Sequence, residues 1–325
     1  MDELNYKEVF ETLVNETAKY VTDNNLKAMV LGISGGIDST VVAAICYEVS
    51  VITGIPLIGR SLPTKHNKEG EVTTADLVGK AFCNNYMEFN MDIPYRKFAH
   101  SITFSEGLLS EGSPFTFDGV SPKQTPLANG NIQARLRMIY LYNLASVYNG
   151  IVMDTDNLTE HNLGYWTLHG DVGDFNPIGG LWKTEIFKLA EWLSKEYWKV
   201  NIAWLQEEEF NKNDFRNRTG HQAIAIAKSL ALKPTAGLGI TNNDLEELGA
   251  ESYDQVDSIL HEILCWKLAE DQNPSNPEER YQKFMEDQQM LDTPIKVIQN
   301  VAKRHFYSSF KRKKLPIKIE RHLLV

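Results

Sequence analysis

The stretch Leu31-Gly32-Ile33-Ser34-Gly35-Gly36-Ile37-Asp38-Ser39-Thr40 lies where an apolar run ends and an amphipathic pattern begins. Residues 28–33 are typical of a strand buried on both faces, and residues 40–51 favour a helix. At such a junction, several backbone N–H groups and the positive end of the helix dipole point at one place. The two glycines let an anion approach the backbone, and Ser34 and Ser39 add hydroxyl donors. The stretch therefore predicts an anion-binding loop.

Asp38 is the unusual member of this loop. A carboxylate repels a phosphate unless a cation lies between them, so Asp38 predicts a Mg²⁺ ion. The loop has no Lys before its last Ser, as a Walker loop would, and it lacks the G-x-G-x-x-G spacing of a dinucleotide fingerprint. It is therefore neither of these common nucleotide loops. An ordinary strand–turn–helix, with glycines kept for geometry, is the alternative.

The first half of the chain alternates apolar runs with amphipathic segments. We expect strands at 28–33, 54–59, 86–91 and 150–153, and helices at 6–21, 40–51, 67–82 and 131–148. Residues 107–126 are rich in Gly, Pro and Ser and predict a loop. The alternation predicts an α/β fold in which helices flank both faces of a parallel sheet.

Helical patterns dominate after Pro177. We expect helices at 184–198, 222–232, 254–268, 277–290 and 294–306, with a Pro- and Asn-rich joint at 271–277. The sequence contains no internal repeat. We therefore expect a single domain over residues 1–325, with an α/β core at about 24–190 and a mostly helical extension at about 191–325.

The composition argues against several classes of protein. Hydrophobic residues make up 42% and charged residues 23% of the chain, which is ordinary for a soluble globular protein. The net charge of −10 argues against a nucleic-acid binder. No apolar run is long enough to cross a bilayer, and the acidic N-terminus is unlike a secretion signal. Cys46, Cys83 and Cys265 fit no disulfide or metal pattern, so we expect a cytoplasmic protein.

The glycine-rich loop resembles the S-G-G-x-D-S loop of the ATP pyrophosphatases, which cleave ATP between its α and β phosphates. This resemblance implies a Rossmann-like fold of the adenine nucleotide alpha hydrolase-like type. It also implies that ATP is a co-substrate, that Mg²⁺ is the cofactor, and that the loop binds ATP. The loop residues expected to contact ATP are Gly32, Ile33, Ser34, Gly35, Gly36, Ile37, Asp38 and Ser39.

A second block narrows the family. Residues 131–138, Asn-Ile-Gln-Ala-Arg-Leu-Arg-Met, are similar to the N-x-x-A-R-x-R-M helix of ammonia-dependent NAD synthetases. Arg135 and Met138 share one face of the expected helix, whereas Arg137 points elsewhere. In the family the matching arginine contacts deamido-NAD, which implies that role for Arg135. A structural ion pair is the alternative for both arginines.

A third block follows the fourth expected strand. Residues 152–160 and 164–171 are similar to the family's G-T-[DG]-x-x-E and G-[YF]-x-T-K-[YH]-G-D. The resemblance implies that Thr155 contacts ATP and that Glu160 is a second carboxylate for Mg²⁺, beside Asp38. Open α/β sheets bind ligands at the carboxyl ends of their strands, where Thr155 falls. A solvated helix face is the alternative for Glu160.

Residues 174–184 are similar to the family's D-x-N-P-[IL]-x-x-L-x-K. The resemblance implies that Asp174 recognises deamido-NAD and that Lys183 contacts ATP phosphate. A cation at the start of a helix is slightly unfavourable, and so Lys183 itself hints at a nearby anion. Asp38, Glu160 and Lys183 are the expected catalytic residues.

The C-terminal matches are shorter. Residues 233–238 resemble P-T-A-x-L, which implies that Thr235 contacts ATP. Residues 247–257 are similar to L-G-x-x-Y-x-x-[IV]-D, to which no role is attached. Residues 310–312 lie where the family shows H-K-R, so Lys311 is expected to reach deamido-NAD; a solvated basic tail is the alternative.

Three positions depart from the family pattern. Leu168 stands where a Lys commonly touches deamido-NAD, and Phe310 replaces the usual His. Both changes remove polar contacts to the pyridine nucleotide, each worth roughly 1.5–3 kcal/mol if charge-assisted. Either His169 and Arg312 compensate, or the acceptor differs. Asp154 replaces a common Gly, a change that the sequence leaves without explanation.

The resemblance implies a carbon–nitrogen ligase that amidates deamido-NAD to NAD with ammonia, through an acyl-adenylate and with release of AMP and pyrophosphate. Another ATP pyrophosphatase acting on a different carboxylate, or a nucleotide-binding homologue without activity, is the alternative. The family pattern shows no glutaminase domain here, so free ammonia is the simplest nitrogen source. A homodimer is implied, and residues 107–126 and 198–218 are expected to form lids.

Overall fold

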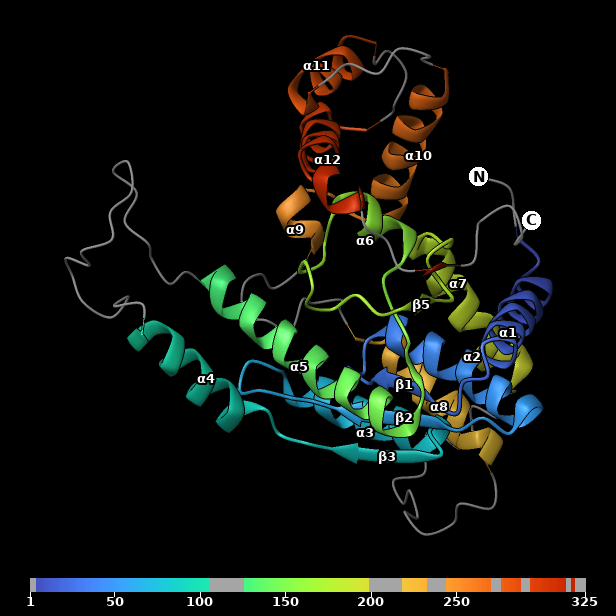
Figure 1. The fold of residues 1–325 in the computed structure, drawn as a ribbon. Coiled ribbons are helices and arrows are strands. Elements are labelled where there is room, and N and C mark those ends of the chain that lie inside the picture. The colour runs from blue at the N-terminus through green and yellow to red at the C-terminus, as the bar shows by residue number, and fades with distance from the viewer. Residues whose placement is uncertain are drawn as a thin grey trace.

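The computed structural model describes residues 4–105, 126–198, 218–232, 244–269, 276–287, 293–313 and 317–318. A four-stranded sheet of order β3-β2-β1-β4 lies at its centre (Figure 1). Its strands are β1 (Met29–Gly32), β2 (Leu57–Ser61), β3 (Asn85–Glu88) and β4 (Ile151–Val152). All three pairings are parallel, and Met29 of β1 is in register with Leu57 and Ile151. The predicted parallel α/β sheet is confirmed.

Alternate residues of β1 pack against different helical layers. Met29 and Leu31 belong to a large apolar cluster on one face of the sheet, and Val30 belongs to a smaller cluster on the other. The first layer contains α1 (Tyr6–Asp23), α2 (Ile37–Thr53), α3 (Glu69–Phe82), α7 (Lys183–Trp192) with a π-helical turn (Leu193–Tyr197), and α8 (Arg218–Leu230). On the other face lies α5 (Pro126–Tyr148), with α4 (Asp92–Ser105) packed beside it. Both faces of the sheet are therefore covered, as expected for the apolar strands β1 and β4.

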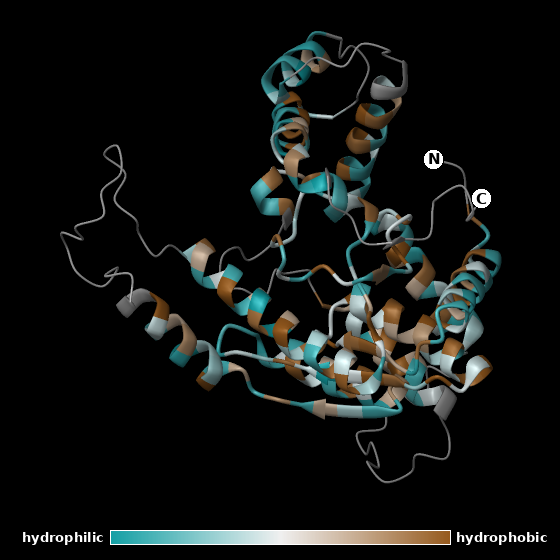
Figure 2. Ribbon diagram, in the orientation of Figure 1, coloured by the Kyte–Doolittle hydropathy of each residue, from teal (hydrophilic) through white to brown (hydrophobic). Residues whose placement is uncertain are grey.

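A third apolar cluster holds together a group of helices that stands over the sheet layers in Figure 1. We call it the helical unit: α6 (Leu158–Leu163), α9 (Asp244–Leu248), α10 (Tyr253–Ala269), α11 (Pro277–Asp287) and α12 (Ile295–Tyr307). Its core contains Ile259, Phe284, Val301 and Phe306, all at most 1% exposed. In Figure 2 teal runs along α11, the outermost of these helices. The 3₁₀ turn Ser309–Lys313 follows α12.

Several details differ from the sequence-based expectations. The strand expected at 54–59 begins at Leu57, because Gly54 takes a left-handed conformation (φ 74°) that ends α2. Helices α4 and α9, and the small parallel sheet of β5 (Phe175–Asn176) and β6 (Ile317–Lys318), were not predicted. Helix α8 packs in the core of the sheet layers rather than in the helical unit.

In the part of the chain that the structure describes, no helix combines the length and the apolar character that a membrane span requires.

Candidate active site

The loop between β1 and α2 is held in one conformation by its own side chains. Ser34 Oγ and Ser39 Oγ share a hydrogen bond of 2.9 Å, and Ser34 Oγ also accepts the Gly36 N–H at 3.2 Å. Gly35 has a φ of 83°, and a Cβ at this position would lie 2.4 Å from the Glu71 carbonyl oxygen of α3. Glycine is therefore required here both for the backbone conformation and for the close packing on α3.

Helix α8 supports the same loop from behind. Ser229 Oγ donates to the Gly35 carbonyl at 2.7 Å and shares a hydrogen bond of 2.6 Å with Thr40 Oγ1. Thr40 lies in the first turn of α2, which begins at the N-cap Gly36. The loop and the N-terminus of α2 are thus fixed before any anion arrives, as preorganised charge stabilisation requires.

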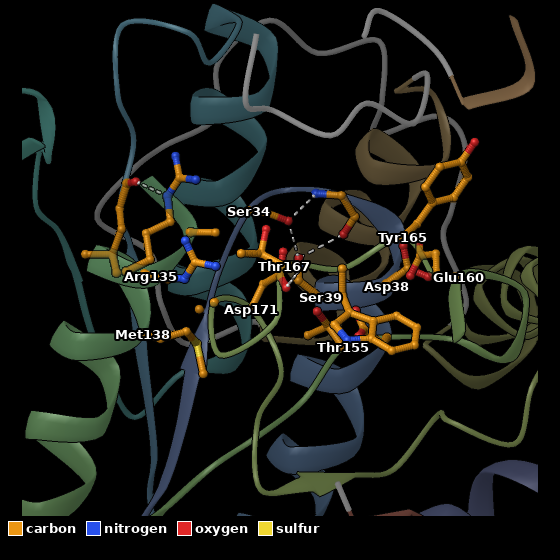
Figure 3. A pocket seen from close by; sticks show the side chains of 18 of the residues that line it. Ser34, Asp38, Ser39, Arg135, Met138, Thr155, Glu160, Tyr165, Thr167 and Asp171 are labelled. Carbon is orange, nitrogen blue, oxygen red and sulfur yellow. Dashed lines mark hydrogen bonds between the residues drawn. The ribbon is translucent and has the colours of Figure 1, made fainter. Parts of the chain in front are cut away.

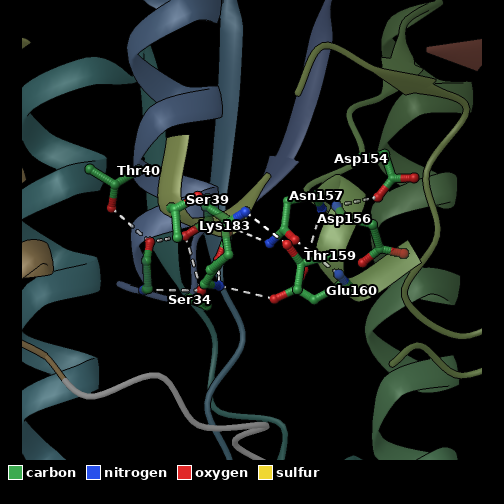
Figure 4. Close-up of polar contacts among 12 residues, drawn as sticks. Ser34, Ser39, Thr40, Asp154, Asp156, Asn157, Thr159, Glu160 and Lys183 are labelled. Carbon is green, nitrogen blue, oxygen red and sulfur yellow. Dashed lines mark hydrogen bonds and ion pairs between the residues drawn. The ribbon is translucent and has the colours of Figure 1, made fainter. Parts of the chain in front are cut away.

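Lys183, at the start of α7, joins the two predicted metal carboxylates (Figure 4). Its Nζ lies 2.5 Å from Asp38 Oδ2 and 3.0 Å from Glu160 Oε1, and its side chain is 3% exposed. Burial alone would lower the pKa of Lys183, but the Asp38 and Glu160 carboxylates raise it well above its ordinary value. The ammonium therefore stays charged across the physiological range of pH.

The carboxylates converge on one cation, and this provides a test of whether the residues fit Mg²⁺. Asp38 and Glu160 contact the same ammonium, that of Lys183, which takes the place of a metal ion between them. Within the described ranges no group of three or more His, Cys, Asp or Glu side chains could hold a metal ion. Mg²⁺ commonly uses one or two carboxylates and takes its other ligands from substrate phosphates and water. Two converging carboxylates fit that pattern.

Glu160 owes its position to the N-terminus of α6. Asn157 caps this helix: its side chain accepts the Glu160 N–H at 3.0 Å, and its own N–H donates to Glu160 Oε2 at 3.3 Å. The Asn157 Nδ2 group also donates to Asp38 Oδ1 at 2.8 Å. One capping box therefore fixes both carboxylates, which are 122 positions apart in the sequence. The alternative of a solvated helix face for Glu160 is not what the structure shows.

Asp154, the unexplained departure, shapes the turn that carries Thr155. Its Oδ1 accepts the N–H groups of Thr155 at 2.6 Å and Asp156 at 3.0 Å. The Asp154 side chain is buried. Burial raises the pKa of Asp154 to about 8. The Asp154 side chain thus holds the turn through hydrogen bonds that a glycine at this position could not form.

A cleft of about 750 Å³ opens between the loop and the helical unit (Figure 3). It brings together most of the predicted site residues. The predicted residues that line it include Asp38, Thr155, Glu160, Lys183, Arg135 and Lys311. Figure 3 shows Arg135 and Met138 of α5 across the cleft from Asp38 and Glu160. A single cavity can thus hold a nucleotide and an acceptor side by side.

Other predicted residues lie elsewhere. Asp174 does not line this cleft; its Oδ1 accepts the Tyr142 hydroxyl of α5 at 2.7 Å. Thr235 lies outside the described residues, and so do nearly all of both expected lids, 107–126 and 198–218. The roles of Asp174 and Thr235 remain predictions.

The two arginines of α5 both reach the cleft. Arg135 donates through Nε and a terminal nitrogen to the Leu168 carbonyl, at 3.3 and 3.2 Å. Arg137, which the helix spacing predicted to point away from the face of Arg135, also lines the cleft. It donates to the Leu62 carbonyl at 2.9 Å and to Asn67 at 3.2 Å, and burial lowers its pKa. Arg137 is thus a site residue that the sequence analysis missed, although its motif position was a signal.

Lys311, which also lines the cleft, is held by backbone carbonyls. Its Nζ donates to the Gly164 carbonyl at 2.7 Å and to the Trp166 carbonyl at 2.5 Å, and it lies 5.5 Å from the Trp166 ring centroid. Burial lowers the pKa of Lys311. These contacts place Lys311 in an ordered 3₁₀ turn and not in a solvated tail.

The two apolar departures face the same cleft. Leu168 and Phe310 both line it, and they are 36% and 58% exposed. His169 and Arg312, which could have replaced the lost polar contacts, do not line the cleft. Arg312 donates instead to the carbonyls of Asn162 and His305. The wall at Leu168 and Phe310 is therefore apolar.

Several other polar residues on the cleft wall were not predicted, among them Arg60, Asp156 and Asp171. Arg60 is the penultimate residue of β2 and is only 6% exposed, with a terminal nitrogen donating to the Gly59 carbonyl at 2.7 Å. Asp156 and Asp171 lie on the segments that follow β4 and α6. Asp171 accepts the Thr167 N–H at 2.7 Å. The position of Arg60 at the carboxyl end of a strand was the signal that could have identified it.

Known proteins resemble this chain along most of its length. The model of the NAD synthase family matches residues 9–315. The NH(3)-dependent NAD(+) synthetase of Methanocaldococcus jannaschii is 31% identical over 261 residues, which cover 78% of this chain and 81% of that protein. The enzyme of the same name from Wolinella succinogenes is also 31% identical over 261 residues, covering 80% and 81%.

Solved structures share the fold. The structure of NMN synthetase from Francisella tularensis aligns with a TM-score of 0.64 and 24% identity, covering 96% of this chain and 98% of that one. A glutamine-dependent NAD(+) synthetase from Cytophaga hutchinsonii aligns with a TM-score of 0.60 and 16% identity, covering 97% of this chain and 51% of that one. With the family match and the 31% identical relatives, the conclusion is that this chain belongs to the NAD synthase family and is a ligase that forms carbon–nitrogen bonds.

Proposed function

We propose that the protein converts deamido-NAD to NAD with ATP and ammonia. The observation that carries the proposal is the single cleft that joins the Ser34–Ser39 loop, the Asp38–Lys183–Glu160 group and Arg135. The synthetases of Methanocaldococcus jannaschii and Wolinella succinogenes carry the ammonia-dependent activity in their names, which supports ammonia as the nitrogen donor.

Chemistry dictates why ATP is needed. A carboxylate is a poor acyl donor because oxide is a bad leaving group. In the proposed reaction, the nicotinate carboxylate attacks the α-phosphorus of ATP, and the bond to the β-phosphate oxygen breaks to release pyrophosphate. Ammonia then attacks the acyl carbon, AMP leaves, and a proton passes to solvent or to the departing phosphate. No protein nucleophile is required, so the enzyme acts by positioning and charge stabilisation.

The residues of the loop would stabilise the departing pyrophosphate. The free N–H groups at the N-terminus of α2 and the hydroxyls of Ser34 and Ser39 are held in place by the hydrogen bonds described above. Lys183 would supply a full positive charge beside them. Asp38 and Glu160 are the residues that would hold Mg²⁺, which when bound neutralises phosphate charge.

The acceptor side of the proposal rests on Arg135 and Lys311. Both are cations with donors directed at backbone carbonyls in the cleft. An anionic substrate would therefore have to replace neutral carbonyl partners, an exchange that charge-assisted hydrogen bonds favour. Asp174, on the outer side of α5 beside Tyr142, would take part only if the substrate extends beyond one chain.

We also propose a homodimer formed through α5. Large apolar side chains on this helix are exposed: Ile139 is 62%, Val147 70% and Leu127 57% exposed. Exposed apolar side chains such as these can be covered at a protein interface. Dimerisation there would bring Asp174 and Tyr142 near the substrate of either chain. Light scattering that finds a fully active monomer would refute this part of the proposal. A cytoplasmic location remains our prediction from the cysteine pattern.

A smaller acceptor is the second candidate. Leu168 and Phe310 remove two polar contacts expected for deamido-NAD, and the Francisella tularensis structure that shares the fold is named an NMN synthetase. Nicotinate mononucleotide carries the same reacting carboxylate without the adenylate half. It would need fewer contacts on the apolar wall.

One assay separates these candidates. The protein is mixed with Mg-ATP, ammonium and either deamido-NAD or nicotinate mononucleotide, and NAD, NMN, AMP and pyrophosphate are quantified. We expect NAD with equal amounts of AMP and pyrophosphate, at a kcat/KM above that for the mononucleotide. A higher kcat/KM for the mononucleotide would select the second candidate. If neither acceptor is amidated, both candidates fail.

A further inference from the structure

Helix α10 presents two residues of an unexplained motif to the catalytic lysine. Tyr253 is the first residue of α10, and Asp257 follows one turn later. Residues four positions apart share a face of a helix, and this face packs against α7, which begins with Lys183. Tyr253 and Asp257 are the Tyr and Asp of the stretch 247–257, whose role the sequence left open.

Asp257 holds the backbone at the start of α7. It is fully buried (0% exposed) and accepts two hydrogen bonds, from the Thr184 N–H at 3.0 Å and from the Thr159 hydroxyl at 2.5 Å. Thr159 Oγ1 in turn accepts the Lys183 N–H at 2.8 Å. A carboxylate at the N-terminus of a helix satisfies otherwise unpaired N–H groups and complements the helix dipole.

The same carboxylate also connects Lys183 to its partner Glu160. Thr159 directly precedes Glu160 in α6, and its hydroxyl lies between Asp257 and the Lys183 backbone. Asp257 therefore joins three helices at one point: α6 with Glu160, α7 with Lys183, and α10. A change at Asp257 would alter the distance between two catalytic groups without removing either.

Tyr253 confines the other end of Lys183. The Lys183 Nζ lies 5.7 Å from the centroid of the Tyr253 ring, within the range of a cation–π contact. Lys183 as a whole is only 2% exposed. The ring of Tyr253 thus covers an ammonium that also contacts Asp38 and Glu160.

We propose that Tyr253 and Asp257 are positioning residues that hold Lys183 for its action on the ATP phosphates. Asp257 fixes the backbone of Lys183, and Tyr253 limits where its ammonium can go. This inference rests on the proposed function for the role of Lys183 in turnover. The claim about the position of Lys183 can be tested independently of activity.

The test uses paired variants of the full chain. Asp257→Ala removes both hydrogen-bond acceptors, whereas Asp257→Asn keeps one carbonyl oxygen and a similar shape. Tyr253→Leu removes the ring, whereas Tyr253→Phe keeps it. Ile259→Val is the matched control, because it trims a buried side chain of α10 that packs in the helical unit and not against Lys183.

Two quantities are measured for each variant. The first is the reactivity of Lys183 toward reductive methylation in the folded protein, determined by peptide mass spectrometry with the exposed Lys188 of the same helix as the reference. The second is kcat and KM in the amidation assay. Circular dichroism verifies folding, and the half-buried Tyr253 provides a test should Asp257→Ala fail to fold.

We expect Lys183 methylation to rise several-fold in Asp257→Ala and Tyr253→Leu and to stay low in Tyr253→Phe and Ile259→Val. We expect kcat to fall about tenfold or more in the first two variants, with the KM for deamido-NAD nearly unchanged, because a small displacement of a catalytic group affects mainly the chemical step. Asp257→Asn should recover part of the loss.

Low methylation of Lys183 in every folded variant would overturn the inference, even if kcat falls. So would equal losses in Tyr253→Phe and Tyr253→Leu, because the ring would then be irrelevant. An inactive wild-type protein would instead refute the proposed function, and the methylation pattern would still decide whether Tyr253 and Asp257 position Lys183.

Discussion

The two ends of the cleft are built differently. At the phosphate end, Ser34 is hydrogen-bonded to Ser39, and the almost fully buried Lys183 forms ion pairs with Asp38 and Glu160. At what we call the acceptor end, the cations Arg135 and Lys311 donate hydrogen bonds to backbone carbonyls, and the cleft wall also carries the exposed apolar side chains of Leu168 and Phe310.

This difference suggests a division of roles, in which one end of the cleft carries out the reaction and the other end selects the substrate. The phosphate end is preorganised by contacts between its own residues, which suits the proposed cleavage of ATP. The acceptor end leaves its polar groups on neutral partners that a substrate could replace. Changes at the phosphate end should therefore affect kcat strongly, whereas changes at the acceptor end should affect the choice and affinity of substrate.

The largest effect should come from Asp38→Ala. It removes a carboxylate that contacts both Lys183 and Asn157, together with one proposed ligand of Mg²⁺. We expect kcat to fall by about 10³-fold or more, because one preorganised electrostatic contact is already worth about 10²–10³ in rate. Formation of NAD and pyrophosphate is followed, with circular dichroism as the control for folding. Activity close to wild type would show that the phosphate end does not work as described.

Glu160→Gln sharpens the same comparison, because it removes charge but keeps structure. A Gln at this position can still form the capping box with Asn157, so α6 should be unaffected. We expect kcat to fall about 10²-fold while the melting temperature changes little. Thermal unfolding and the amidation assay check both parts. An equally large loss of stability would mean that Glu160 acts mainly as a helix cap.

Leu168→Lys tests the acceptor end. It places the cation that the family commonly has on the apolar wall, beside the carbonyl that Arg135 contacts. A charge-assisted contact is worth up to about 1.5–3 kcal/mol, and less at a site that is one-third exposed. We expect the KM for deamido-NAD to fall about three- to tenfold, with the KM for ATP unchanged. Leu168→Met is the control. A change in the KM for ATP instead of the KM for deamido-NAD would contradict the division of roles between the two ends.

The smallest effect should be on stability, through Asp154. Burial raises its pKa to about 8 in the folded protein, compared with an unperturbed value of 3.8. The folded state therefore binds more protons than the unfolded state between these values, and stability falls as pH rises from about 4 to 8. Asp154→Asn keeps an oxygen for the Thr155 and Asp156 N–H groups and should stabilise the protein by about 1–3 kcal/mol at pH 8.

Urea unfolding of wild type and Asp154→Asn at pH 5 and pH 8 measures this difference. We expect the two proteins to differ less at pH 5, where Asp154 is already largely protonated. A constant difference at both pH values would contradict the assignment of a raised pKa to this residue.

Much of the phosphate end could be predicted from the sequence because its parts are local. A buried strand, two glycines and a helix start are adjacent in the chain, and the loop Ser34–Ser39 follows from them directly. The capping box of Asn157 and Glu160 is also a short-range pattern. The pairing of Glu160 with Asp38 was expected from the resemblance to the family, whereas the contact of Asn157 with Asp38 was not predicted.

The remaining features depend on long-range packing that no local pattern encodes. Lys183 was predicted to contact phosphate, but its burial between two carboxylates arises only when α2, α6 and α7 come together. The role of Asp154 became clear only from the structure of the turn that it stabilises. Asp257 lies in a recognised motif, yet its contact with the start of α7 depends on how the helical unit packs on the core. Arg137 was placed away from the site by helix spacing alone.

The most direct test of the central claim follows oxygen from the acceptor. Deamido-NAD labelled with ¹⁸O in its nicotinate carboxylate is converted with Mg-ATP and ammonium, and the products are analysed by mass spectrometry. Attack of that carboxylate on the α-phosphorus predicts one ¹⁸O atom in each AMP and none in pyrophosphate. AMP without the label, or label in pyrophosphate or inorganic phosphate, would contradict the proposed acyl-adenylate chemistry at the Ser34–Ser39 loop.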